Sequence, residues 1–396
     1  MYSFLYTLFL LFFLPIYIFF VKKKGYHFGL KERVFFDKKS SLKDPVWFHC
    51  ASVGELNTAK PLIEYFSKEY DILITVSSPR GWKYAKQNFS NFEVRFLPFD
   101  YKFLHKKFYK TYKPTLLIVL EGEFWYNFIT TISKFIPIVS ANTRISPSSY
   151  KFYKKLSFFY KKIFNAFSKF LVRSDQDKKF LEKFILDKSK IVVCGDLKFV
   201  SSNIKKDIQL EKNNRKVLIA GSTHEPEERI LLEVFSKLKK KYPHLTLIIA
   251  PRHLERINQI IELIKKFGFS YSFRTQTKKL DTDVYIVDTL GELSGLYRYA
   301  DVVFVGGTIA DIGGHNILEP ALEKKPVIIG KHYHKIKDLY NMLKGYNIVS
   351  VVDDEAQLLE KISNLLEKEE TIDIDFKSLQ KKILNCYITN IKNFLG

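Results

Sequence analysis

The stretch that decides the fold is Trp47-Phe-His-Cys-Ala-Ser-Val-Gly-Glu55. An apolar run from Val46 to Cys50 stops at small residues, and a helical pattern opens at Glu55. This order predicts a β-strand, a tight turn and a helix, with Gly54 able to adopt whatever φ angle the turn needs. In an open α/β sheet such a junction lies at the carboxyl end of a strand, where ligands bind. The carboxylate of Glu55 is therefore either a helix N-terminal charge contributing about 0.5 kcal/mol or a functional group.

Length, charge and cysteine content narrow the class of protein. The 396 residues suggest two domains, and the net charge of +22 permits nucleic acid, an anionic membrane surface or phosphorylated substrates as partners. The basic residues are scattered, without zinc-finger spacing or an RNA-binding signature, so nucleic acid is not expected. The three widely spaced cysteines, Cys50, Cys194 and Cys386, predict no disulfide bond and a reducing compartment. Cys50 and Cys194 end apolar runs and are interpreted as buried small hydrophobes.

The first 21 residues have the composition of a membrane anchor. They contain no charged side chain, and Lys22-Lys-Lys24 follows at once. About 20 apolar residues are enough to span a bilayer. A cleaved signal peptide fits poorly, because a basic start and a small-residue cleavage site are missing. The lysines place the body of the protein in the cytoplasm, and Pro15 leaves open a segment that lies in the membrane interface.

Strand-like runs alternate with helical segments in two series, which predicts two mostly parallel sheets covered by helices. A polar, lysine-rich stretch at about 201–215 reads as the linker between them. The expected strands of the first series are Val46–Cys50, Ile72–Val76, Phe92–Leu97, Leu116–Leu120, Ile136–Val139, Phe170–Val172 and Ile191–Val193. Those of the second series are Val217–Ala220, Leu245–Ala250, Val284–Val287, Val302–Val305 and Val327–Ile329. The last segment, Phe376–Leu395, is expected to be an amphipathic helix.

The strand ends of the second series carry Gly, Ser, Thr and His just before helices begin, which is typical of anion-binding loops. No G-x-G-x-x-G follows the first strand of either half and no Walker A lysine motif is present, so dinucleotide redox chemistry and P-loop hydrolysis are poorly supported. Histidine, aspartate and cysteine do not cluster with metal-ligand spacing, which predicts a metal-independent reaction without a cofactor. Two doubly wound domains with nucleotide-type loops in the second suggest a nucleotide-sugar glycosyltransferase.

Nine short motifs then occur in a fixed order along the chain. They are Ala51–Glu55, Leu120–Trp125, Ala141–Ser146, Gly195–Phe199, Ala220–Glu225, Pro251–His253, Gly291–Glu292, Gly306–Gly307 and Gly313–Pro320. Together they resemble the bacterial 3-deoxy-D-manno-octulosonic acid (Kdo) transferases specific for the lipid A precursor. The resemblance implies two Rossmann-like domains facing a cleft, the GT-B architecture. It also implies transfer of Kdo from its cytidine monophosphate donor, CMP-Kdo, onto the lipid A precursor in lipopolysaccharide synthesis at the inner membrane.

On this resemblance the chain divides into four parts. Residues 1–21 form the membrane anchor, 22–203 the acceptor-binding domain, 204–375 the CMP-sugar-binding domain, and 376–396 a helix that packs back towards the N-terminal domain. A two-domain transferase or epimerase that uses a uridine nucleotide sugar is the alternative enzyme. A non-catalytic lipid-A-binding or scaffold protein is the alternative outside enzymes, and the acids at positions 55 and 121 argue against it.

The resemblance assigns catalytic roles to three residues. Glu55 is the proton acceptor in an inverting displacement, and its position at a helix N-terminus predicts a carboxylate that stays ionised at neutral pH. Glu121 is a transition-state stabiliser, although a carboxylate would more naturally orient a cation such as Lys198 or Arg144. Lys198 is expected to reach the phosphate or carboxylate of the donor.

The donor residues implied by the resemblance lie in the second half. Arg252, after Pro251, can grip phosphate or carboxylate in bidentate fashion. Gly291, between Leu290 and Glu292, lets the backbone approach the nucleotide. Asn316, Ile317, Leu318 and Glu319 are expected to form the first turn of a helix, with N–H groups for a phosphate and with Glu319 for the ribose hydroxyls.

Two basic segments are expected to contact the membrane or its lipids. Lys22–Lys24 and the basic, aromatic run Phe103–Tyr112 can dock onto anionic lipid, each cation contributing about 1 kcal/mol near the surface. Solvated lysines are the alternative for that run. Glu32-Arg33, shortly after the anchor, is expected near the phosphates and acyl chains of the acceptor.

Overall fold

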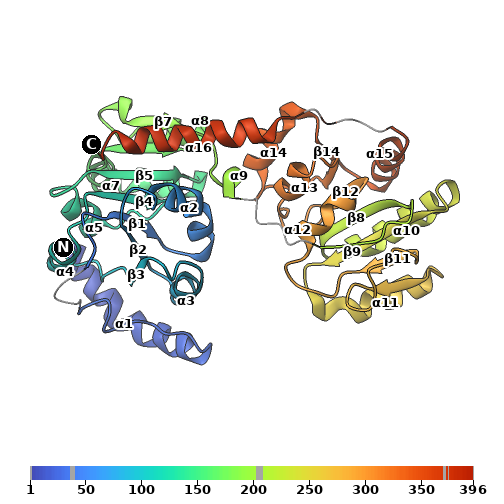
Figure 1. The fold of residues 1–396 in the computed structure, drawn as a ribbon, viewed down its shortest axis with the longest axis horizontal. Helices are drawn as coiled ribbons and strands as arrows, with labels where there is room; N and C mark the ends of the chain where they lie inside the picture. The colour runs from blue at the N-terminus through green and yellow to red at the C-terminus, as the bar shows by residue number, and fades with distance from the viewer. Residues whose placement is uncertain (1, 36–40, 202–207, 369–371, 373, 396) are drawn as a thin grey trace. The chain divides into compact units, whose positions relative to one another are not determined.

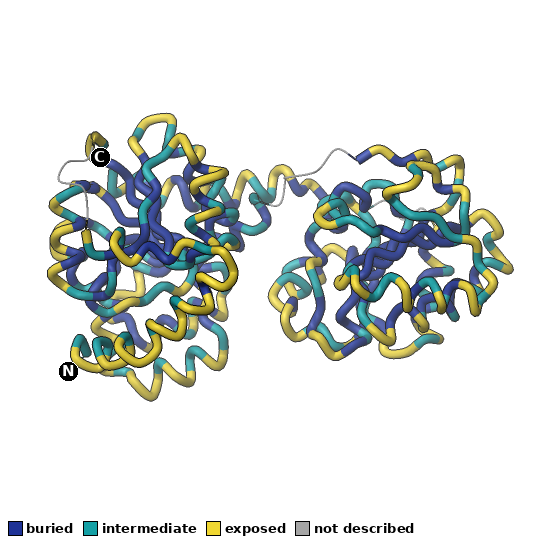
Figure 2. The backbone as a smooth tube through the Cα atoms, turned by 90° about the horizontal axis from the view of Figure 1, so that it is seen from below, coloured by how far each residue is buried: buried dark blue, intermediate teal, exposed yellow. Residues whose placement is uncertain are grey.

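The computed structural model describes residues 2–35, 41–201, 208–368, 372 and 374–395. The chain forms two compact units (Figure 1). Unit 1 contains Met1–Ser201 and Lys377–Gly396, and unit 2 contains Ser202–Phe376. In each unit the buried part of the backbone is the sheet, and the exposed residues gather on the surrounding helices and loops (Figure 2).

Unit 1 is built on a parallel seven-stranded sheet with the order β3-β2-β1-β4-β5-β6-β7. Its strands are β1 (Val46–Cys50), β2 (Ile72–Val76), β3 (Glu93–Phe96), β4 (Leu116–Leu120), β5 (Ile138–Thr143), β6 (Lys169–Val172) and β7 (Ile191–Val193). Every residue of β1, β2 and β4 is buried, as expected for central strands covered on both faces. The chain reverses its strand order beside β1, so the crevice at the carboxyl ends of β1 and β4 is the topological switch point of this sheet.

The helices of unit 1 cover both faces of this sheet. They are α1 (Tyr2–Lys23), α2 (Val53–Phe66), α3 (Pro79–Asn88), α4 (Lys102–Tyr112), α5 (Tyr126–Ile132), α6 (Pro147–Lys155), α7 (Ser157–Asn165), α8 (Asp175–Leu181), α9 (Lys198–Ser201) and α16 (Phe376–Lys392), with a 3₁₀ turn at Lys188–Lys190. The core is strongly aromatic. Trp47 packs against Phe108 and Phe128, and Phe164 contacts Phe170.

Unit 2 repeats the architecture with the strand order β10-β11-β9-β8-β12-β13-β14, again all parallel. The strands are β8 (Lys216–Thr223), β9 (Leu245–Pro251), β10 (Tyr271–Phe273), β11 (Val284–Ile286), β12 (Val302–Val305), β13 (Val327–Gly330) and β14 (Val349–Val352). The helices are α10 (Glu227–Lys241), α11 (Ile257–Lys266), α12 (Leu293–Leu296), α13 (Leu318–Leu322), α14 (Lys337–Leu343) and α15 (Glu355–Glu367), with 3₁₀ turns at Leu254–Arg256, Tyr297–Tyr299 and Lys344–Tyr346.

The predicted fold class is confirmed, and each expected strand is present with small changes at its ends. Two strands were missed, β10 and β14. Both lie at an edge of the second sheet and are only three or four residues long, so neither carries a long apolar run. Part of the expected linker, residues 202–207, lies outside the described residues.

The expectation of three unpaired cysteines is wrong. Cys194 follows β7, Cys386 lies on α16, and their sulfur atoms form a disulfide bond. Their 192-residue separation hid this pairing, because only the packing of α16 onto unit 1 brings the two Cα atoms to 5.5 Å. Cys50 is buried and free, as expected, and burial raises the pKa of its thiol well above the usual value.

Candidate active site

The turn between β1 and α2 holds the carboxylate of Glu55 in a reciprocal helix cap. Ser52 is the N-cap residue, and its hydroxyl oxygen accepts a hydrogen bond from the backbone N–H of Glu55 at 3.3 Å. The Glu55 carboxylate accepts one from the backbone N–H of Ala51 at 2.7 Å and one from the Ser52 hydroxyl at 3.2 Å. This geometry is a variant of the capping box, because the Glu55 side chain accepts from the N–H of Ala51, the residue before the N-cap, and not from the N–H of Ser52 itself. The cap fixes where the carboxylate lies.

The prediction that Glu55 stays ionised at neutral pH is wrong. Burial raises the pKa of Glu55 to about 8, and the nearby charges of Glu123 and Glu121 raise it further. The hydrogen bonds from Ala51 and Ser52 act in the opposite direction without cancelling this effect. A helix N-terminus favours a negative charge, but here the loss of water around the carboxylate outweighs it. Glu55 thus becomes a stronger base than an exposed glutamate.

Glu121 and Lys198 form the ion pair that was expected between an acid and a cation at this sheet edge. The ammonium of Lys198 lies 3.2 Å from a carboxylate oxygen of Glu121. Glu121 directly follows β4 with a φ angle of +55°, a left-handed conformation that costs a non-glycine residue free energy. Backbone strain of this kind is concentrated at functional sites, where the surrounding fold enforces it.

Glu123 and His49 complete the site. Glu123 belongs to the motif Leu120–Trp125, and the two acids after this apolar run were candidates for catalysis, for holding a neighbouring base or for capping the next helix, whereas sequence analysis gave His49 no role. His49 lies on β1 without solvent exposure, and its Nε2 atom is 3.6 Å from Glu123. The indole N–H of Trp125 donates a hydrogen bond of 2.7 Å to Glu123. Burial acts to raise the pKa of Glu123, but His49 and Trp125 outweigh it, so this pKa is lowered and Glu123 remains charged beside Glu55. The sequence did contain a sign of this role for His49, because a histidine is unusual within an apolar run such as Val46–Cys50.

The C-terminal helix α16 holds the loop that carries Lys198. The Tyr387 hydroxyl donates a hydrogen bond of 2.7 Å to the carbonyl of Gly195, and the Gln380 amide donates one of 2.6 Å to the carbonyl of Phe199. Gly195 has a φ angle of +95°, and a Cβ atom there would lie 3.1 Å from Ile383 of α16. This position therefore favours glycine on both conformational and steric grounds. Sequence analysis could not connect this loop to a helix almost 200 residues later.

In unit 2, predicted donor residues gather at the carboxyl ends of β8 and β9. Pro251 is the last residue of β9, and the backbone N–H of the exposed Arg252 donates to the Thr223 carbonyl at 3.0 Å. The rings of His224 and His315 stack with their Nε2 atoms 2.8 Å apart. Burial, the neighbouring His224 and Arg252 lower the pKa of His315 to about 4. His315 is therefore neutral at pH 7 and can accept or donate a hydrogen bond beside a cationic guanidinium.

The glycine-rich loop after β12 depends on Glu227, a residue that sequence analysis did not single out. Glu227 lies in the first turn of α10 without solvent exposure. Its carboxylate accepts hydrogen bonds from the backbone N–H groups of five residues: His224, Gly307, Thr308, Ile309 and Ala310. A buried carboxylate with this many donors orders the loop around itself.

The segment Asn316–Glu319 differs from the prediction, because helix α13 begins at Leu318. The Asn316 side chain accepts a hydrogen bond from the N–H of Leu318 at 3.0 Å and donates one of 2.9 Å to Glu319. The N–H of Leu318 is thus already bonded within the protein. Ile317 is the N-cap residue. Burial raises the pKa of Glu319, and the bond from Asn316 opposes part of that shift.

The loop Leu290–Glu292 combines exposure with a fixed acid. Gly291 has a φ angle of +75°, and the neighbouring Leu290 is 70% exposed. The Glu292 carboxylate lies 3.3 Å from the guanidinium of Arg274 and accepts a hydrogen bond from Thr289. Glu292 therefore has structural partners inside its own unit. Among the described residues, no three His, Cys, Asp or Glu side chains are grouped so that they could hold a metal ion.

The family model and the curated relatives that match this chain carry the same name. Residues 28–201 match the family model described as "3-Deoxy-D-manno-octulosonic-acid transferase (kdotransferase)". The chain is 35% identical to 3-deoxy-D-manno-octulosonic acid transferase from Aquifex aeolicus, over 91% of this chain and 97% of that protein. It is 33% identical to the transferase of the same name from Haemophilus influenzae, over 94% and 92%. Among solved structures, UDP-GlcNAc 2-epimerase from Neisseria meningitidis matches with a TM-score of 0.60 at 12% identity. The match covers 88% of this chain and 100% of that chain, and it shows a similarity of fold.

Replacement of Glu227 by Gln should destabilise unit 2. The variant removes the charge and places an N–H group among five backbone donors, so we expect a loss of roughly 3 kcal/mol in the free energy of unfolding. Thermal unfolding measures the loss, and hydrogen exchange at residues 307–310 should speed up. Glu225→Gln, which changes an exposed acid two residues away, serves as the control. Unchanged exchange in the Glu227 variant would contradict the role given to this carboxylate.

Replacement of Glu55 by Gln should stabilise the protein only at alkaline pH. The folded state raises the pKa of Glu55 from its ordinary 4.5 to about 8, so the stability linked to its proton is complete below pH 4.5 and is lost as the pH rises through 8. The neutral amide avoids that loss and still accepts from Ala51. We therefore expect a higher melting temperature than wild type at pH 9 and little difference at pH 6. Glu64→Gln, on the exposed face of α2, is the control, and an equal effect at both pH values would contradict the prediction.

Proposed function

The chain belongs to the 3-deoxy-D-manno-octulosonic acid (Kdo) transferase family, and on that premise we propose that it transfers Kdo from CMP-Kdo onto a lipid A precursor, with Glu55 as the general base. It is a glycosyltransferase, and its reaction is Kdo transfer in lipopolysaccharide synthesis. The observation that carries the mechanism is the buried carboxylate of Glu55, whose pKa is raised to about 8, close to neutral pH.

The reaction is displacement of a phosphate leaving group by an alcohol. The hydroxyl oxygen of the acceptor forms a bond to the anomeric carbon of Kdo, and the bond between that carbon and the phosphate oxygen breaks, with its electron pair leaving on CMP. The hydroxyl proton passes to the carboxylate of Glu55 as the acceptor oxygen loses electron density to the new bond. A base is most effective when its pKa lies near the ambient pH, which burial achieves here for a glutamate. Attack from the face opposite CMP inverts the configuration.

Lys198 is the cation that we assign to the negative charge of the donor. Its side chain is 41% exposed and is oriented by the ion pair with Glu121, so its ammonium stays positioned before substrate arrives. The fixed position matters because a preorganised charge stabilises developing negative charge without reorganising. Glu121 is thus a positioning residue for Lys198, and the strain at its backbone is consistent with a fixed orientation.

In unit 2 we assign the CMP portion of the donor to the loops after β8, β9, β11 and β12. The exposed guanidinium of Arg252 suits a phosphate or carboxylate, and the left-handed Gly291 allows close approach of the base or ribose. Glu319, oriented by Asn316, is the acceptor for the ribose hydroxyls. Pro251, Leu290, Glu292, Ile317 and Leu318 are the remaining residues assigned to this site.

The anchor and its charges support a place at the inner membrane with the catalytic units on the cytoplasmic side. Helix α1 is 22 residues long and strongly apolar; Lys22 and Lys23 lie in its last turn, and Lys24 follows it. Basic residues flanking an apolar segment favour the cytoplasmic side and attract anionic lipid. The lipid acceptor is then presented from the membrane in which α1 is embedded.

A transfer assay tests the proposed function. Purified full-length protein is mixed with a CMP-Kdo generating system and tetra-acylated lipid A precursor, and we expect a Kdo-bearing lipid product. UDP-GlcNAc in place of the donor should give none. Glu55→Ala should abolish transfer while CMP binding by unit 2 persists. Absence of product with wild type would overturn the proposed function, and turnover by the variant would remove Glu55 as the base.

The pH dependence of this assay should report Glu55. Because the base must be deprotonated, kcat/KM should rise about tenfold per pH unit below the pKa and level off above pH 8. Glu123→Gln removes a negative charge that raises the pKa of Glu55, so its profile should shift to lower pH. Glu64→Gln on the outer face of α2 should leave the midpoint unchanged. An identical midpoint in wild type and Glu123→Gln would contradict the assignment.

A further inference from the structure

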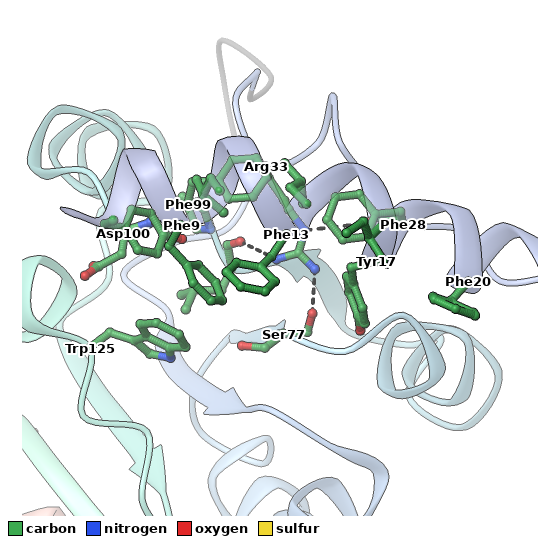
Figure 3. Close-up of a pocket in the computed structure, with 16 residues that line it drawn as sticks. Phe9, Phe13, Tyr17, Phe20, Phe28, Arg33, Ser77, Phe99, Asp100 and Trp125 are labelled. Atoms are coloured by element: carbon green, nitrogen blue, oxygen red, sulfur yellow. Dashed lines mark hydrogen bonds between the residues drawn. The ribbon is translucent and has the colours of Figure 1, made fainter. Parts of the chain in front are cut away.

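A large apolar groove lies between α1 and the rest of unit 1. Its volume is about 570 Å³, within the range of roughly 300–1,000 Å³ that is typical of small-molecule sites. The wall on α1 includes Phe9, Phe13 and Tyr17, and the opposite wall includes Phe99 and Trp125 (Figure 3). One residue of its lining, Trp125, also contacts the site described above through its hydrogen bond to Glu123.

The charged groups in the groove, Arg33 and Asp100, already have partners inside the protein. The Arg33 guanidinium donates to the carbonyl oxygens of Phe28, Leu97 and Ser77, and it lies 4.4 Å from the centre of the Phe96 ring. It is 7% exposed, so the earlier expectation that Arg33 contacts acceptor phosphates finds no support in its surroundings. The groove therefore presents aromatic and aliphatic surface, which suits a hydrocarbon chain rather than an anionic headgroup.

The Asp100 carboxylate, the other charged group in the lining, is satisfied in the same way. It accepts hydrogen bonds from the Tyr2 hydroxyl at 2.6 Å and from the backbone N–H groups of Asn127 and Phe128 at 3.1 and 2.7 Å. The ring of His105 lies 2.9 Å from it. An incoming ligand thus gains no charge contact at Asp100.

Helix α1 lies along unit 1 instead of projecting from it. At its first turns, Tyr2 bonds to Asp100, and Thr7 lies 2.8 Å from the hydroxyl of Tyr101. At its far end the Tyr17 ring packs edge-on against Phe28, and Val21 is buried. The helix is roughly 33 Å long, about the thickness of the hydrocarbon core, so a helix that crossed the bilayer could touch a cytoplasmic domain at one end only. Contact at both ends is instead the arrangement expected of a helix that lies in the membrane interface, parallel to the surface.

The rest of α1 faces outward and is apolar. Phe4, Leu5, Leu11, Phe12 and Phe19 are each more than half exposed, a face suited to the acyl region of one leaflet. Lys22 and Lys23 lie in its last turn, and the neighbouring helix α4 carries four further lysines, which complement an anionic membrane. The groove under α1 therefore lies at the depth of lipid chains.

The groove also adjoins the carboxylate of Glu55. Trp125, in its lining, donates to Glu123, whose charge raises the pKa of Glu55. Ser77, also in the lining, precedes Ser78, whose N–H donates a hydrogen bond of 3.0 Å to the carbonyl of Ala51. Ala51 in turn donates to Glu55. One or two residues thus separate the hydrocarbon groove from the proposed base.

We propose that this groove binds one acyl chain of the lipid acceptor and so sets the position of the acceptor hydroxyl relative to Glu55. The inference rests on the proposed function for the identity of the lipid. An acyl chain gains little free energy on moving from the bilayer into the groove, because both surroundings are equally apolar. The effect of the groove is therefore on position: a reacting group displaced by about 1 Å can lose about a hundredfold in rate.

A kinetic experiment tests the groove with a matched pair of variants. Leu14 lines the groove, so Leu14→Trp fills part of it, whereas Leu5→Trp adds the same side chain to the outward face of α1. With the tetra-acylated acceptor we expect Leu14→Trp to lower kcat/KM about tenfold, with the KM for CMP-Kdo unchanged, and Leu5→Trp to match wild type. With the deacylated disaccharide acceptor, both variants should equal wild type. Equal kcat/KM for all three proteins on the acylated acceptor would overturn the inference.

A cross-linking experiment keeps the inference testable if Leu14→Trp fails to fold or if the deacylated acceptor is not used. Wild-type protein in phosphatidylethanolamine vesicles is irradiated with lipid A precursor that carries a diazirine in one acyl chain. We expect adducts on Phe9, Phe13 and Phe99, and unlabelled lipid A precursor should remove them. Adducts confined to the outward residues of α1, or adducts that the surrounding phospholipid suppresses, would overturn it. Absence of any Kdo transfer by wild type would instead overturn the proposed function, whatever the adducts show.

Discussion

The candidate active site of unit 1 depends on one arrangement, a buried carboxylate held in a helix cap. The bonds from Ala51 and Ser52 fix the position of Glu55, and burial sets its proton affinity. These effects oppose each other, because the cap donors favour the charged form and the loss of water disfavours it. Burial prevails, and the result is a glutamate whose pKa of about 8 suits proton abstraction from an alcohol. An exposed carboxylate at the same turn would be only a stabilising helix charge.

The groups around Glu55 come from distant parts of the chain. Glu121 and Glu123 follow β4, His49 lies within β1, and Lys198 starts α9. The parallel sheet brings the ends of β1 and β4 to one edge, which explains why acids after two separate strands meet there. The loop before Lys198 is held from the other side by α16, through Tyr387, Gln380 and the disulfide bond of Cys386. The C-terminal helix thus supports the loop that carries the candidate site residue Lys198.

Unit 2 shows the same reliance on a buried carboxylate for a different purpose. The carboxylate of Glu227 accepts hydrogen bonds from the backbone N–H groups of residues 307–310 and so fixes the conformation of this loop from inside the protein. The loop that Glu227 holds is close to the predicted donor residues. His315 packs against Gly307 of this loop and stacks on His224, next to Arg252. Preformed loops lower the ordering cost of donor binding. Glu227 therefore stabilises a loop of unit 2 that lies within the proposed donor site.

The local pattern of the sequence was sufficient for the order of motifs, the family and all strands except the short edge strands β10 and β14. Short apolar runs bounded by turn residues indicate buried strands. The residues that follow these runs lie at the same edge of a parallel sheet. The same pattern could not report burial, because the water around Glu55 is removed by segments far away in sequence. It therefore missed the raised pKa of Glu55, the bond between Cys194 and Cys386, and the loop-holding role of Glu227. Composition predicted an apolar anchor at residues 1–21, but only contacts at both ends of α1 decided that it lies flat against its own domain.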